Sequence, residues 1–136
     1  MKFINEHNIS DSDVSVLSTQ SENPQGYGRI IRDKNNNFVA IVEEKDATDE
    51  QKSVNEINSG VFLVQSDLLF GALNNVSNSN AQGEYYLTDI VTILKSQGHK
   101  VSAFNLAEFE ELQGVNTVDD LKKAEDYYFK MRKWYG

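Results

Sequence analysis

The chain has 136 residues, 39% hydrophobic and 25% charged, which predicts one folded domain, residues 1–136, with a hydrophobic core. Its 13 Lys and Arg against 21 Asp and Glu give a formal net charge of -8, which opposes binding to nucleic acid. With no cysteine and two histidines, disulfides, zinc–thiolate sites and histidine clusters are excluded, so any metal must be an oxygen-liganded ion. The sequence contains neither an apolar run of membrane-spanning length nor a secretory signal at its start, so we expect a cytoplasmic protein that does not span a membrane.

Apolar periodicity and turn residues predict alternating helices and strands. Residues 1–8 resemble the last turns of a helix, with Asn8 as its C-terminal cap. The next elements, in chain order, are a strand over 14–19, hairpin strands over 28–32 and 38–44, a short helix over 46–53 capped by Asp46 or Thr48, a strand over 58–65, a helix over 66–76, a helix ending near Gly98, a strand over 100–106 and a helix beginning at Thr117.

This order of elements predicts an α/β fold whose sheet is mixed, because the hairpin is antiparallel. The apolar run over 58–65 further predicts a strand buried on both faces. A doubly wound sheet grips phosphate at a glycine-rich turn between a strand and a helix, and the sequence contains no such turn.

Polar stretches at strand ends and helix starts are the candidate ligand-binding positions. Taken singly, each residue has an ordinary structural explanation: Glu43 as an exposed strand carboxylate, Asn58 as a strand-end hydrogen bonder, Thr88 and Asn116 as helix caps. The functional prediction rests on their order and spacing together. The stretches cover residues 26–30, 41–48, 56–60, 82–89 and 114–117.

In this order the stretches resemble the motifs of the bacterial N-acetylglucosamine-1-phosphate uridyltransferases. The matching segments are Asn-Pro-x-Gly-Tyr-Gly-Arg-Ile from Asn23, Ile-Val-Glu-x-Lys-Asp-Ala-Thr from Ile41, Glu-Ile-Asn-Ser-Gly from Glu56, Asn-Ala-Gln-Gly-Glu-Tyr-Tyr-Leu-Thr-Asp from Asn80 and Gly-Val-Asn from Gly114. The resemblance covers about Asn8 to Tyr128. It implies part of a Rossmann-like nucleotide-diphospho-sugar transferase fold, a mixed sheet with flanking helices. These residues would form its sugar-phosphate-binding C-terminal portion, with the N-terminal nucleotide-binding half missing.

The resemblance also implies roles for individual side chains in binding the sugar. In the family, an oxygen of the sugar phosphate attacks the α-phosphorus of UTP and pyrophosphate leaves. By the same resemblance, the backbone of Gly28 contacts N-acetylglucosamine, Glu43 accepts a hydrogen bond from a sugar hydroxyl, and Asn58 hydrogen-bonds the sugar. Tyr86 and Thr88 line the same pocket.

For the phosphates and the metal, the resemblance implies that Lys45 faces a phosphate and that Asn116 ligates magnesium through its amide oxygen. The family's second metal ligand, in an Asp-x-Asp-like motif, and its glycine-rich basic nucleotide loop are absent from the sequence. Also absent are the hexapeptide repeats of the left-handed β-helix domain that performs acetyl transfer in bifunctional members.

Three hypotheses follow. In the first, the chain is part of an enzyme that makes UDP-N-acetylglucosamine, a cell-wall precursor, from UTP and N-acetylglucosamine 1-phosphate. The lone chain would then be inactive. The second is a non-catalytic module that binds a sugar phosphate or nucleotide sugar. The third is a related nucleotidyltransferase for another sugar phosphate or for phosphocholine. Because absent strands would leave sheet edges and an apolar face uncovered, we also expect self-association or a complementary N-terminal chain.

Overall fold

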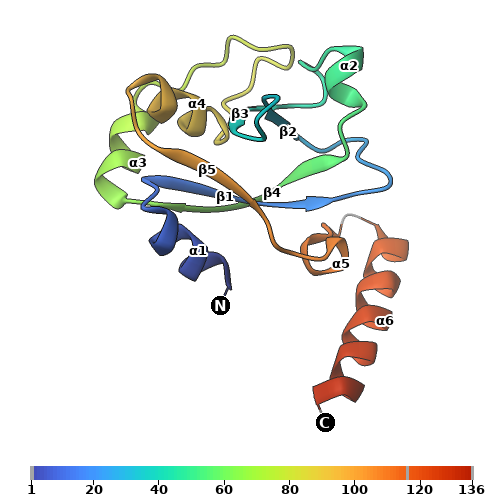
Figure 1. Ribbon diagram of the computed structural model, residues 1–136. Helices are drawn as coiled ribbons and strands as arrows, with labels where there is room; N and C mark the ends of the chain where they lie inside the picture. The colour runs from blue at the N-terminus through green and yellow to red at the C-terminus, as the bar shows by residue number, and fades with distance from the viewer. Residues whose placement is uncertain (1, 116, 136) are drawn as a thin grey trace.

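A computed structural model describes residues 2–115 and 117–135, with side chains described as far as residue 132. A five-stranded sheet in the order β3-β2-β4-β1-β5 forms its centre (Figure 1). β1 and β5 are parallel, whereas the other neighbouring strands are antiparallel, which confirms the predicted mixed sheet. The strands are β1 (Val14–Gln20), β2 (Arg29–Arg32), β3 (Phe38–Val42), β4 (Glu56–Val64) and β5 (Val101–Asn105).

Helices flank the sheet on both sides. α3 and α4 pack together against one face, α1 lies on the other side, and α6 extends away from the sheet (Figure 1). No helix in the described ranges is both long and apolar enough to cross a membrane. The helices are α1 (Lys2–Ser10), α2 (Asp49–Lys52), α3 (Ser66–Leu73), α4 (Asp89–Ser96), α5 (Phe109–Leu112) and α6 (Val118–Tyr135).

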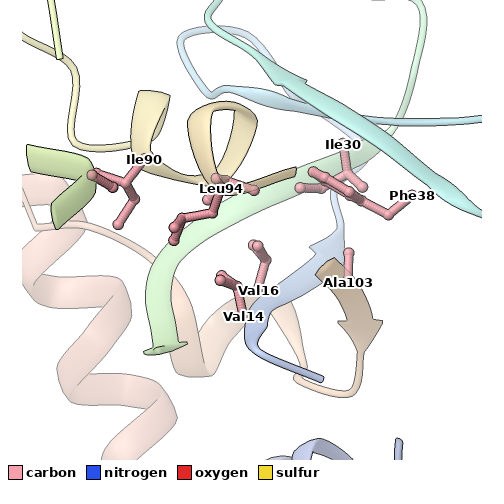
Figure 2. Close-up of a cluster of buried hydrophobic side chains, with 9 residues drawn as sticks. Val14, Val16, Ile30, Phe38, Ile90, Leu94 and Ala103 are labelled. Atoms are coloured by element: carbon pink, nitrogen blue, oxygen red, sulfur yellow. The ribbon is translucent and has the colours of Figure 1, made fainter. Parts of the chain in front are cut away.

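The core lies between the sheet and the α3–α4 pair. Val14 and Val16 point to the same face of β1, because side chains alternate along a strand, and both are fully buried. Leu94, one turn beyond Ile90 on α4, packs into the same cluster. Figure 2 shows the side chains of α4 meeting those of the strands. This packing fixes the position of α4, which begins directly after Thr88.

The structure corrects the predicted end of the first helix. α1 continues past Asn8 to Ser10, and Asp11 adopts the left-handed conformation with φ of 51°. An aspartate side chain tolerates this conformation because it is short and polar. Asn8 is therefore not the cap, although its carbonyl oxygen accepts a hydrogen bond from the Asp11 amide at 3.3 Å.

The prediction that the strand over 58–65 is buried on both faces is wrong. Phe62 and Val64 of β4 pack against the core, but Val61, which directly precedes Phe62, is 43% exposed. Val61 points to the opposite face from Phe62 and Val64, and only one of these faces meets α3 and α4. Apolar composition alone did not reveal which face is covered.

The edges of β4 differ in how they are paired. One edge pairs with β1 along almost the whole strand, from Val14 opposite Val64 to Gln20 opposite Glu56. The other edge pairs with β2 only where Arg29 faces Ile57. Within the described part of the chain, the second half of β4 therefore offers an unpaired edge.

Candidate functional site

The register of β2, β3 and β4 brings three of the predicted site residues together. Arg29 lies opposite both Val42 on β3 and Ile57 on β4. The residues just beyond these partners are Gly28, Glu43 and Asn58, and the Asn58 amide donates a hydrogen bond to the Gly28 carbonyl oxygen at 2.8 Å. These contacts bring together a backbone at the start of β2, a carboxylate at the end of β3 and a carboxamide within β4.

Gly28 and Glu43 approach each other so closely that there is little room for a side chain at position 28. A Cβ atom there would lie 3.2 Å from Oε2 and 3.3 Å from Oε1 of Glu43, and 3.3 Å from Cγ2 of Ile41. Gly28 itself is buried. Glycine at this position therefore lets the Glu43 carboxylate lie directly against the backbone of β2.

The segment before α4 supplies Tyr86 and Thr88. Thr88 donates from Oγ1 to Oε1 of Glu43 at 2.8 Å, across 45 residues of sequence. One oxygen of the carboxylate is therefore held by the protein. Since a carboxylate can accept several hydrogen bonds, Glu43 retains acceptor capacity for a ligand.

Two hydrogen bonds hold the loop that carries Tyr86. The Asp46 carboxylate accepts from the Ala81 amide at 2.8 Å, which ties the loop to the end of β3. Nε2 of Gln82 donates to the Tyr86 hydroxyl oxygen at 2.8 Å. Asp46 and Gln82 were not predicted as site residues, although both belong to the quoted polar stretches, and only the folded chain shows what they hold.

These residues border a cavity of about 260 Å³, slightly below the usual size of a small-ligand pocket. Gly28 adjoins it through Glu43, Asn58 adjoins Gly28, and neither is among its lining residues. A larger cavity of about 690 Å³ at the ends of β1 and β5, against α5 and α6, contains none of the predicted substrate residues. The smaller cavity is lined by Ile41, Val42, Glu43, Asp46, Ser79, Asn80, Tyr86, Thr88 and Asp89.

The cavity is acidic. Burial raises the pKa of Asp89, and the negative charge of Asp46 adds to that rise. Desolvation also raises the pKa of Tyr86, although the hydrogen bond from Gln82 acts in the opposite direction. The tyrosine hydroxyl therefore stays neutral near pH 7, and the carboxylates favour ligand groups that donate hydrogen bonds, such as hydroxyls and amides.

The remaining predicted residues are Lys45 and Asn116. Lys45 is exposed and makes no hydrogen bond or ion pair within residues 2–115 and 117–135. Asn116, the predicted magnesium ligand, lies outside the described residues. In the described part of the chain, no group of three or more acidic or histidine side chains could hold a metal ion.

Comparison with known proteins shows the family of this chain. A family model described as nucleotidyl transferase matches residues 1–134. The proteins called bifunctional protein GlmU are 50% identical over 118 residues in Lactobacillus gasseri and 43% identical over 126 residues in Bacillus subtilis. These alignments cover 87% and 93% of this chain, but 26% and 28% of the relatives. The chain thus spans about a quarter of the length of the curated relatives it matches.

A solved structure shows the same fold. It is a Bacillus anthracis protein described as a glucose-1-phosphate thymidylyltransferase in complex with a sucrose, and it superimposes with a TM-score of 0.66 at 19% sequence identity. The superposition covers 93% of this chain and 47% of that protein, so the described sheet and helices correspond to about half of that protein's fold. Because the nucleotidyl transferase model matches residues 1–134, the chain belongs to the nucleotidyl transferase family.

Proposed function

We propose that the chain binds the sugar of N-acetylglucosamine 1-phosphate within an enzyme that makes UDP-N-acetylglucosamine from this sugar phosphate and UTP. The proposal rests on the Glu43 carboxylate, which is held between the Gly28 backbone and the Thr88 hydroxyl at the edge of a cavity. Similarity to the GlmU proteins supports it. Residues 1–136 would then be the sugar-phosphate-binding portion of the catalytic domain.

In this proposal each side chain has a definite task. A sugar hydroxyl donates to Glu43, whose orientation is fixed by Thr88 at 2.8 Å. Oδ1 of Asn58 accepts from the Gly60 amide at 3.1 Å, and its amino group donates to the sugar. Tyr86 forms a wall of the cavity against the sugar ring. Polar groups that converge in this way select a hydroxyl-rich ligand, because a ligand without hydroxyls would leave them unpaired.

The reaction assigned to the whole enzyme is a nucleotidyl transfer. An oxygen of the sugar phosphate forms a bond to the α-phosphorus of UTP as the bond to pyrophosphate breaks. The described residues contribute by holding the attacking sugar phosphate in position, which removes much of the entropic barrier.

Magnesium serves this family generally, and when bound it neutralises charge on the phosphates. We assign Asn116 as one ligand and Lys45 to a phosphate. The described residues offer no group that would complete a metal site, so no step is derived through the ion. We further propose that these 136 residues alone bind the sugar phosphate without turnover, since no glycine-rich phosphate loop occurs in their sequence.

Calorimetric titration of the chain with N-acetylglucosamine 1-phosphate, beside an assay for pyrophosphate release with UTP and magnesium, tests the proposal. We expect measurable binding, no turnover, and binding that weakens by about tenfold or more in Glu43→Ala and in Asn58→Ala. Glu125→Ala, which removes an exposed carboxylate from α6, is the matched control and should bind like the wild type. Wild-type affinity in Glu43→Ala would refute the proposed site, and turnover by the lone chain would refute the proposed inactivity.

A further inference from the structure

A buried arginine lies immediately beside the sugar site without lining its cavity. Arg29, at the start of β2, is 1% exposed. Its Nη1 donates to the carbonyl oxygen of Tyr27, and its Nη2 donates to Oε2 of Glu44 at 2.6 Å. Nη2 also lies 3.4 Å from the carbonyl oxygen of Lys52, at the end of α2. One guanidinium group therefore joins three segments of the chain.

The partners of Arg29 are sequence neighbours of the two closest site residues. Tyr27 precedes Gly28, and Glu44 follows Glu43. We propose that Arg29 and Glu44 are positioning residues that hold the Gly28 backbone and the Glu43 carboxylate in register to receive the sugar. This inference rests on the proposed function of the same site.

Stability alone does not explain this pair. A buried ion pair contributes little net stability, because the cost of removing two charges from water offsets their attraction. The Nε of Arg29 is moreover buried with no hydrogen-bond partner among the described residues, which adds to the cost. What the pair does provide is geometry, since a planar guanidinium fixes the direction of several acceptors at once.

A second arginine on the same strand shows the contrast. Arg32 binds Glu56 through two hydrogen bonds of 2.7 Å, and its Nη2 also donates to the Ala103 carbonyl oxygen at 2.8 Å. Glu56 in turn accepts from Ser18 at 2.6 Å. This network ties β2, β4, β1 and β5 together, and no atom in it belongs to the sugar site. Arg32 is therefore a matched control for Arg29.

Lysine at position 29 would keep the charge but cannot hold two acceptors in the fixed directions of a guanidinium. In Arg29→Lys we expect faster hydrogen exchange at the Asn58 amide, whose partner is the Gly28 carbonyl oxygen, with unchanged exchange along the central strand β1. Affinity for N-acetylglucosamine 1-phosphate should fall about tenfold. In Arg32→Lys the Asn58 amide should change no more than the amides of β1, and affinity should be retained.

Glu44, whose side chain is 27% exposed, gives a second test if Arg29→Lys does not fold. Glu44→Gln keeps an acceptor oxygen for Arg29 and should retain most of the protection at Asn58, whereas Glu44→Ala should lose it. Unchanged exchange at Asn58 in both Arg29→Lys and Glu44→Ala, or a change of equal size at every amide of β1, would overturn the inference. If the wild-type chain does not bind the sugar phosphate, the proposed function fails, while the exchange data still decide whether the pair positions Gly28.

Discussion

Alanine at position 28 should weaken sugar binding far more than it weakens the fold. The new Cβ would lie 3.2 and 3.3 Å from the carboxylate oxygens of Glu43 and 3.3 Å from Cγ2 of Ile41. Ordinary van der Waals contact begins at about 3.4 Å, so the neighbours must move by a few tenths of an ångström. The carboxylate moves more easily than Ile41, which packs against the core. Glu43 therefore shifts relative to the ligand and to Thr88.

The size of the effect follows from the interaction that the shift disturbs. A hydrogen bond to a charged group contributes about 1.5–3 kcal/mol, which is roughly a 10- to 150-fold change in dissociation constant. The fold should lose only about 1 kcal/mol, at the low end of the range for overpacking, because the end of a side chain can yield. We therefore expect Gly28→Ala to lower the affinity for the sugar phosphate more than it lowers the free energy of unfolding.

Calorimetric titration with N-acetylglucosamine 1-phosphate and urea unfolding measure the two quantities. Gly71→Ala is the control, because a Cβ at that position of α3 would meet nothing within 4 Å. It should bind like the wild type and gain about 0.5–1 kcal/mol, since glycine is unfavourable inside a helix. Wild-type affinity in Gly28→Ala would show that binding does not require Glu43 to lie so close to Gly28. Loss of folding would show that Ile41, not Glu43, limits the space.

Three further predictions concern the core, the acidic cavity and the open strand edge. Leu94→Ala, which truncates a side chain 1% exposed in the core, should cost about 2–5 kcal/mol in urea unfolding. The folded-state pKa of Asp89 is raised above 3.8, first by burial and then by Asp46, so its ionisation destabilises the fold. Its contribution is most favourable below pH 3.8 and is lost as pH rises through the folded pKa. Asp89→Asn should therefore remove this part of the pH dependence of the free energy of unfolding. Equal pH slopes of that free energy in the wild type and in Asp89→Asn would contradict the prediction. Finally, we expect the chain to self-associate in light scattering and Val61→Lys, on the open half of β4, to weaken the association; a monomeric wild type would exclude it.

The elements near the site were predictable because local chemistry determines them. Asp33 accepts hydrogen bonds from the amides of Asn35 and Asn37 at 2.8 and 2.9 Å, and Asn36 has φ of 65°. The asparagine-rich loop therefore closes the predicted hairpin. Closure of this hairpin sets β3 beside β2, and the polar residues at the strand ends follow. Likewise, Thr48 forms the capping box of α2 from the position where a cap was predicted.

Contacts between distant segments could not be predicted in this way. Asp46 reaches the Ala81 amide across 35 residues, and although both belong to quoted motifs, nothing local indicates that they pair. The sequence marks Arg29 only as part of a motif, because its burial depends on the packing of β2 against α2 and β4. The one-sided burial of β4 was missed for a related reason: which face of a strand is covered depends on where the helices pack.

The charge of the cavity determines which part of a ligand it can accept. Glu43, Asp46 and Asp89 border the cavity, whereas no lysine or arginine is among its lining residues. A phosphate placed there would meet like charges at short range, with less screening than in open water. A neutral sugar instead finds acceptors for its hydroxyl and amide hydrogens. If the chain binds a sugar phosphate as proposed, Glu43 therefore faces the sugar and the phosphate points out of the cavity. In that arrangement the described residues select the sugar, and charge on the phosphates is neutralised elsewhere.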